Sequence, residues 1–131
     1  MKRIIIFVVL FAVLGGSLVT LLTGCSSEAA GDVRVEYTPG DVFTTNVKDS
    51  YRILKTSIVL VVNKEGMEET LAKENTRIRD SIIFLLRQLD EDAVRAPGTQ
   101  ERLRNDIITA LNERLELDIF VEVLFNDFVM G

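Results

Sequence analysis

The feature that most constrains this chain is an uncharged apolar run over residues 4–22, IIIFVVLFAVLGGSLVTLL. An α-helix needs roughly 20 apolar residues to cross the ~30 Å hydrocarbon core of a bilayer, so the run is long enough to span a membrane. Lys2 and Arg3 precede it, and positive residues favour the cytoplasmic side. We therefore expect residues 1–25 to be a membrane anchor with a cytoplasmic N-terminus, and the remaining chain to be exported.

The only cysteine, Cys25, closes the sequence LTGC directly after this run. These four residues resemble the lipobox of bacterial lipoproteins, in which the signal peptide is cleaved before the cysteine and the thiol carries diacylglycerol. They are equally compatible with an uncleaved helix that places a small apolar Cys25 at the membrane interface. Both alternatives tether the following chain to a membrane, because two acyl chains suffice for stable anchoring. Cys25 is therefore a candidate lipidation site.

Composition excludes several classes of chemistry. The chain has no His, which removes the commonest general base and the commonest metal ligand. Its single Cys excludes an intramolecular disulfide and a CxxC zinc site. The net charge of −5 argues against a nucleic-acid partner. We expect no catalytic, cofactor or metal site, and we do not expect an enzyme.

The next segments predict a linker followed by two strands. Residues 26–40 are small and polar and are interpreted as a linker, although Val33, Val35 and Tyr37 alternate with polar residues. Pro39 and Gly40 then predict a tight turn, after which a folded domain covers residues 41–131. Residues 42–48 predict a short edge strand, and residues 52–62 predict a central strand. One face of the central strand would carry Leu54, Thr56, Ile58, Leu60 and Val62.

Helical spacing follows over residues 66–89, where Ile78, Ile82, Leu85 and Leu89 recur on one face. Residues 90–99 predict a short helical turn and a connector, and Thr99 is the expected N-cap of a second amphipathic helix. Residues 118–130 predict a final strand. The strand's first face would carry Ile119, Val121, Val123, Phe125 and Val129. The order β-β-α-α-β predicts an α+β domain with both helices on one face of a small sheet.

Charged residues in this domain are mostly interpreted as surface groups. Asp90, Glu91 and Asp92 fit helix caps and solvated surface, and Asp127 lacks a neighbouring partner for acid–base work. Arg77 and Asp80 lie three residues apart on the first helix. They predict either a surface ion pair, which contributes about 0–1 kcal/mol, or part of a contact with a protein partner.

The ordered motifs resemble the flagellar basal body-associated FliL family. The resemblance rests on YTPGDVFTTNV and YRILKTSIVLVVN, then IRDSIIFLLRQLDEDAV, then GTQERLRNDIITALNERL and the terminal IFVEVLFNDFVMG. It implies a single-pass inner-membrane protein whose periplasmic domain is similar to stomatin/prohibitin-type domains. It also implies a homo-oligomeric ring around the flagellar stator proteins that supports torque, swimming or swarming motility, and chemotaxis.

Two features depart from the family pattern: the short cytoplasmic segment before residue 4, and the lipobox-like context of Cys25. The family resemblance favours an uncleaved anchor, whereas the lipobox favours an alternative function. In that alternative the chain is a membrane-tethered envelope lipoprotein with a scaffold or binding role unrelated to flagella. The linker, residues 26–40, is either a contact with the stator or a plain spacer.

Overall fold

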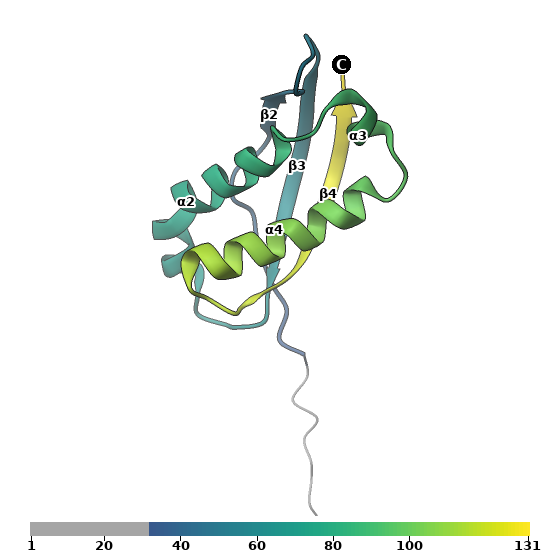
Figure 1. The fold of residues 1–131 in the computed structure, drawn as a ribbon. Coiled ribbons are helices and arrows are strands. Elements are labelled where there is room, and N and C mark those ends of the chain that lie inside the picture. The colour runs from purple at the N-terminus through teal and green to yellow at the C-terminus, as the bar shows by residue number, and fades with distance from the viewer. Residues whose placement is uncertain (1–31) are drawn as a thin grey trace, which may run out of the picture. The chain divides into compact units, whose positions relative to one another are not determined.

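A computed structural model describes residues 32–131, so the predicted anchor and Cys25 lie outside the described part. Within residues 32–131, no helix has both the length and the apolar character that a membrane crossing needs. The elements in chain order are β1 (Val35–Tyr37), β2 (Phe43–Asn46), β3 (Ile53–Val62), α2 (Glu68–Leu86), α3 (Glu91–Arg95), α4 (Thr99–Leu115) and β4 (Phe120–Met130). This part of the chain is an α+β domain, as the sequence predicts (Figure 1).

The four strands form one antiparallel sheet with β3 at its centre. β4 pairs along the whole of one side of β3. On the other side, β1 pairs with the C-terminal part of β3 and β2 pairs with its N-terminal part. The ten residues of β3 therefore support every other strand.

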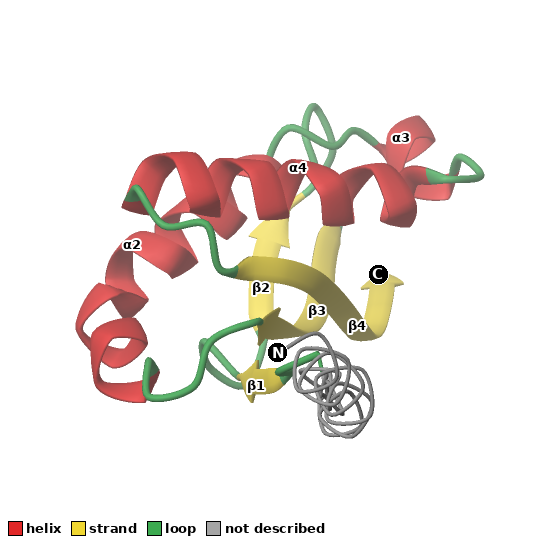
Figure 2. Ribbon diagram, turned by 90° about the horizontal axis from the view of Figure 1, so that it is seen from below, coloured by secondary structure: helices red, strands yellow, loops and turns green. Residues whose placement is uncertain are grey.

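Helices α2 and α4 lie on the same side of the sheet, and the core is between them and the strands (Figure 2). The predicted face of β3 points into this core, because Leu54, Ile58 and Leu60 are each at most 1% exposed. The helices contribute their predicted apolar rows. The buried helical residues of the core are Leu71, Ile78, Ile82, Leu86, Leu103, Ile107 and Leu111.

The first correction to the sequence prediction concerns the linker, because Val35–Tyr37 form strand β1 instead of an unstructured spacer. Tyr37 fixes this strand to α2: its hydroxyl donates to Leu71 O at 3.1 Å and to Asn75 Oδ1 at 2.9 Å. Partial burial raises the pKa of the Tyr37 phenol, which keeps it a neutral donor. The ordered fold thus includes part of the segment that was predicted to be a linker.

A second correction concerns the final strand, whose expected alternation is wrong. The register skips Val121, between the pairs Val61–Glu122 and Val62–Phe120, and skips Asn126 in the same way. Each β-bulge adds one residue and reverses the inward and outward parity beyond it. The residues of β4 that pair with the buried face of β3 are Phe120, Val123, Phe125, Phe128 and Met130. Val121 and Val129 are exposed instead.

Side chains from two other elements hold the bulged strand in place. Asn112 of α4 accepts from Ile119 N and Phe120 N, each at 3.1 Å, and donates to Phe120 O at 3.0 Å. At the second bulge, Ser57 N donates to the Asp127 carboxylate, and Thr56 Oγ1 donates to Asp127 O at 2.6 Å. Asp127 therefore satisfies backbone of β3 that the bulge would leave unpaired.

The start of α4 also differs from the prediction. Gly98 precedes the helix with φ of +79°, and Thr99 is the first helical residue instead of the N-cap. The left-handed conformation lets the chain turn sharply out of α3, and it favours glycine. Thr99 is buried, and its hydroxyl donates to Ala93 O of α3 at 2.5 Å. Its side chain joins two helices instead of capping one.

An ion pair joins the segment before β1 to β4 across the central strand. Val61 of β3 lies in register between Glu36 of β1 and Glu122 of β4. Arg34, just before β1, forms an ion pair with Glu122 that reaches across β3 at this level. Val61 is 2% exposed, and among the described residues both long helices, α2 and α4, lie on the other face of the sheet.

Candidate functional site

The predicted contact residues Arg77 and Asp80 join α2 to α4. Arg114 of α4 donates to Asp80 Oδ2 at 2.6 Å and to Ser81 Oγ at 3.2 Å. In return, Arg77 donates to Arg114 O at 2.6 Å and forms an ion pair with Glu74 at 3.0 Å. Arg77 and Asp80 do not form the ion pair with each other that their spacing predicts.

This arrangement stabilises the C-terminal end of α4. The last carbonyls of a helix have no partner within the helix, and positive groups favour the negative end of its dipole. Arg77 supplies both a donor and a positive charge to that end. The two residues thus have an internal role, and their predicted role in binding a partner remains a prediction.

A second polar cluster centres on Glu91 at the start of α3. Its carboxylate accepts from Ser50 Oγ at 2.5 Å and forms ion pairs with Arg52 at 3.3 Å and Arg95 at 3.1 Å. The Ser50 hydrogen bond, followed by the two guanidinium groups, lowers the pKa of Glu91 below its usual value. Asp90 caps α3 by accepting from Ala93 N at 2.8 Å, as predicted for this acidic run. The cluster holds the β2–β3 hairpin against α3.

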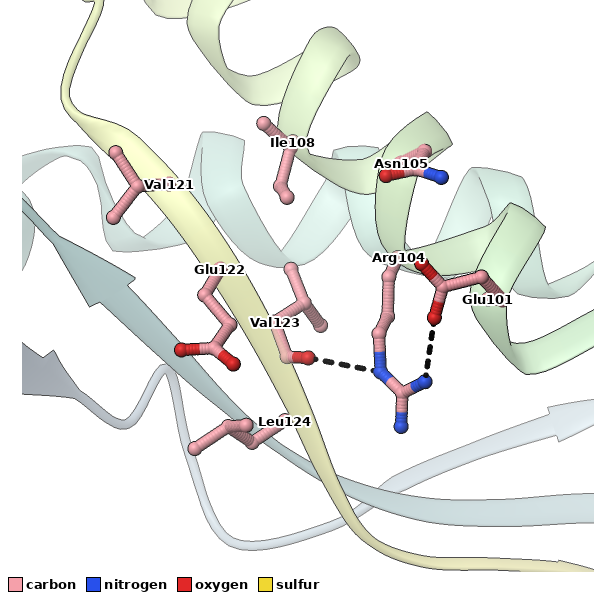
Figure 3. Close-up of a pocket in the computed structure, with 8 residues that line it drawn as sticks. All are labelled: Glu101, Arg104, Asn105, Ile108, Val121, Glu122, Val123 and Leu124. Carbon is pink, nitrogen blue, oxygen red and sulfur yellow. Dashed lines mark hydrogen bonds and ion pairs between the residues drawn. The ribbon is translucent and has the colours of Figure 1, made fainter.

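A groove of about 280 Å³ lies beside strand β4, which we call the α4–β4 groove (Figure 3). Its lining comprises Glu101, Arg104, Asn105 and Ile108 of α4 and Val121 to Leu124 of β4. Arg104 donates to Val123 O and to Glu101 Oε2, each at 3.1 Å, and its guanidinium lies 5.3 Å from the centre of the Phe125 ring. Arg104 therefore blocks strand addition at this part of the β4 edge, while exposed Val121 leaves an apolar surface beside it.

A hollow of about 420 Å³ lies next to Phe84 on the outward side of α2. We call its lining residues the Phe84 patch: Lys48, Asp80, Ile83, Phe84, Arg87 and Gln88. Phe84 is 62% exposed, and it is the only aromatic residue on the helices of residues 32–131. Within residues 32–131, neither Lys48 nor Arg87 forms an ion pair. The patch thus combines an exposed aromatic ring with two available cations.

Both surfaces are suited to binding a protein. The carboxylates beside the α4–β4 groove each contact a guanidinium group, Glu101 with Arg104 and Glu122 with Arg34. Among residues 32–131, no cluster of three or more Asp, Glu, His or Cys side chains could hold a metal ion. Exposed aromatic, arginine and aliphatic side chains are typical of protein interfaces.

Sequence reasoning did not identify the Phe84 patch, although a signal was present. Phe84 lies two positions after Ile82, which places it about 200° around the helix from that buried residue. A large aromatic residue on the polar side of an amphipathic helix is an indication of a contact surface. No local pattern in the sequence places Lys48 beside the end of α2. Its position depends on the hydrogen bond from Lys48 N to Leu89 O, just after that helix, at 2.9 Å.

Comparison with known proteins gives one family. A search of curated proteins found no match. The family model described as flagellar basal body-associated protein FliL matches residues 37–130, from Tyr37 in β1 to the end of β4. This match includes all the residues of both surfaces and most of the chain. The chain therefore belongs to the FliL family of proteins associated with the flagellar basal body.

Proposed function

We propose that this protein is a structural subunit at the flagellar motor, where it forms a ring around the stator units and supports torque generation. The observation that carries the proposal is the family match over residues 37–130, since this family is associated with the flagellar basal body and is not known as an enzyme family. The two binding surfaces of the domain agree with a subunit that acts through contacts.

In this proposal residues 4–22 span the inner membrane, and residues 32–131 lie in the periplasm next to the stator. The proposed topology is supported by the uncharged run and by the two positive residues, Lys2 and Arg3, before it. A reporter enzyme that is active only in the periplasm, fused after Gly131, should be active in cells. Activity only with a cytoplasmic reporter at the same position would contradict this topology.

Deletion of the gene tests the motor function directly. We expect deleted cells to assemble flagella but to swim more slowly, with the deficit increasing as viscosity rises, and to regain wild-type speed when the full chain is supplied. Viscous drag raises the torque that swimming requires, so the loss of a ring that supports torque should appear most clearly at high viscosity. An unchanged speed at every viscosity would count against the proposal.

The Arg77 and Asp80 prediction fits this proposal with one restriction. A stator segment that binds these residues must compete with Arg114, which already contacts both of them. An Arg114→Lys variant should keep the positive charge of residue 114 but lose the planar guanidinium that donates to both Asp80 and Ser81. If Asp80 binds the stator, this variant should increase its crosslinking to it, whereas Arg77, which contacts the main-chain O of residue 114, should crosslink as in the wild type.

The alternative function, an envelope lipoprotein with a scaffold role, is favoured by the LTGC sequence at Cys25. Intact mass of the purified protein distinguishes the two anchors, because cleavage removes the residues before Cys25 and adds lipid to its thiol. A Cys25→Ser variant is the matched control, since it should block lipidation and leave an uncleaved helix unaffected. An unlipidated full-length mass for the wild type would exclude the lipoprotein alternative.

A further inference from the structure

We propose that the Phe84 patch of one copy binds the α4–β4 groove of the next copy, so that neighbouring domains join head to tail. This inference rests on the proposed function, because a ring requires two different contact surfaces on every subunit. It goes further by assigning both surfaces. Two features of each surface support the assignment: size and charge.

The size of one exposed side chain matches the groove. Phe84 is an exposed ring at the border of its own hollow, and the α4–β4 groove has a volume of about 280 Å³. A cavity of roughly 150 Å³ is enough to hold a benzene ring, so the groove has room for a phenyl group. Ile108 and Val121 provide aliphatic contact surface on the two sides of the groove (Figure 3). The rest of the exposed groove lining is mainly polar, so Phe84 would contact this aliphatic part while the charged side chains surround it. Aromatic residues are enriched among the anchors of protein interfaces.

The charges are also complementary. The lining of the Phe84 patch has two cations, Lys48 and Arg87, and one carboxylate, Asp80, which Arg114 already neutralises. The lining of the α4–β4 groove has two carboxylates, Glu101 and Glu122, each of which contacts one arginine, Arg104 or Arg34. A carboxylate has about four acceptor positions, so its contact with one arginine leaves room for a second cation.

The same charges disfavour a symmetric dimer through the Phe84 patch. Two Phe84 patches placed face to face would bring Lys48 and Arg87 of one copy against the same cations of the other. Like charges at an interface cost free energy and act against the wrong pairing. Pairing between unlike surfaces is therefore preferred, which is the arrangement that extends into a ring instead of stopping at a dimer.

The two surfaces share no residue and lie on different elements, so one domain can use both at once. The Phe84 patch is on α2 and the β2–β3 hairpin, whereas the groove is on β4 and the N-terminal half of α4. A copy bound at one surface therefore does not occupy the residues of the other.

A photocrosslinking residue at position 84 tests this contact in the full chain in its native membrane. We would replace Phe84 by p-benzoylphenylalanine, which keeps an aromatic ring, and irradiate cells that carry two differently tagged copies. The expected product is a covalent dimer that contains both tags. Mass spectrometry should place the attachment within residues 101–108 or 121–124. The matched control has the same photoreactive residue at Tyr51, which is fully exposed on the β2–β3 hairpin outside both surfaces.

Other outcomes overturn the inference in distinguishable ways. A dimer attached outside residues 101–108 and 121–124 would refute the assigned surfaces and leave the ring intact. Attachment only to a different protein would show that the Phe84 patch binds another partner. No dimer from position 84 together with a dimer from position 51 would assign the interface to the hairpin. If neither position gives a dimer, the head-to-tail contact is refuted, and the swimming assay then tests the motor role separately.

A charge exchange provides a second test that folding defects cannot imitate. Arg87→Glu alone and Glu101→Lys alone should each lower the yield of the position-84 dimer by about threefold, as expected for a partly exposed ion pair. When both changes are present in every copy, the yield should recover. Glu69→Lys, at an exposed site of α2 outside both surfaces, is the control partner for Arg87→Glu. The assignment would be contradicted if the dimer yield of Arg87→Glu recovered when it is combined with Glu69→Lys but not when it is combined with Glu101→Lys.

Discussion

Strands β3 and β4 are neighbours in one sheet, yet different interactions hold them in place. β3 has a regular alternation, and its inward side chains are almost completely buried. β4 pairs with all of β3 but contains two bulges, and polar side chains from α4 and from the strand itself fix each irregular point. Burial is sufficient to position a regular strand. An irregular strand also needs specific hydrogen bonds, and single substitutions can separate the two contributions.

The largest effect is expected in the apolar centre of β3. Ile58→Ala removes a side chain that is 1% exposed and packs in the core, so it should lower the free energy of unfolding by about 2–5 kcal/mol. Chemical denaturation of the full chain in detergent, followed by circular dichroism, measures the change. Val121→Ala, at the exposed bulge of β4, should change stability by less than about 0.5 kcal/mol. Similar losses for the two variants would break the comparison.

The next effect concerns the first bulge of β4. Asn112→Ala removes the acceptor for Ile119 N and Phe120 N and the donor to Phe120 O, so it should lower stability by about 2 kcal/mol. Asn105→Ala, an exposed position on the same helix, should be nearly neutral. The same denaturation assay applies. A neutral Asn112→Ala would mean that packing alone positions β4.

A smaller effect is expected at the second bulge. Asp127→Ala leaves Ser57 N without its side-chain acceptor and should cost about 1 kcal/mol, whereas Asp127→Asn keeps an oxygen and should cost less. Hydrogen exchange provides a local readout, because the Ser57 amide should exchange faster in Asp127→Ala. Unchanged exchange at Ser57 would show that the carboxylate does not protect the bulge.

The smallest effect concerns the hairpin that leads into β3. Because the folded state lowers the pKa of Glu91, its contribution to stability is present above the ordinary carboxyl pKa of 4.5. That contribution is lost as the pH falls through the lowered value. Glu91→Gln should therefore reduce the loss of stability on acidification while it changes stability only slightly at neutral pH. Glu69→Gln on α2 is the control, and an equal response of both variants would remove Glu91 from the explanation.

The predictability of the fold follows the same division. The order of the main elements and the buried face of β3 could be predicted because alternation and helical spacing are local patterns. Which residues of β4 point into the core could not be predicted, because Val121 and Asn126 look like ordinary strand residues in the sequence. Their exclusion from the register depends on Asn112 and Asp127, which act across the tertiary structure. β1 was missed because three residues are too few to establish a period.

The candidate surfaces were predictable only in part. Charged residues at short helical spacing suggested Arg77 and Asp80, but their partner Arg114 is on another helix and could not be identified from the sequence. The α4–β4 groove requires the register of β4, which the bulges change. Phe84 had a local signal in its position away from the apolar row of its helix. The family, in contrast, was identified from the order of its motifs and is confirmed by the match to residues 37–130.

Strand β1 determines how the domain responds to mechanical force. A pull on Asp32 along the strand acts on the three β1–β3 pairs in shear, so their hydrogen bonds share the load instead of opening one after another. The ion pair from Arg34 to Glu122 adds a contact at one end of β1, and the hydrogen bonds of the Tyr37 hydroxyl add contacts at the other end. Force that enters at Asp32 therefore passes into the central strand and from there into the whole sheet. In the proposed function, a pull from the tether would therefore be spread over the sheet instead of acting on β1 alone.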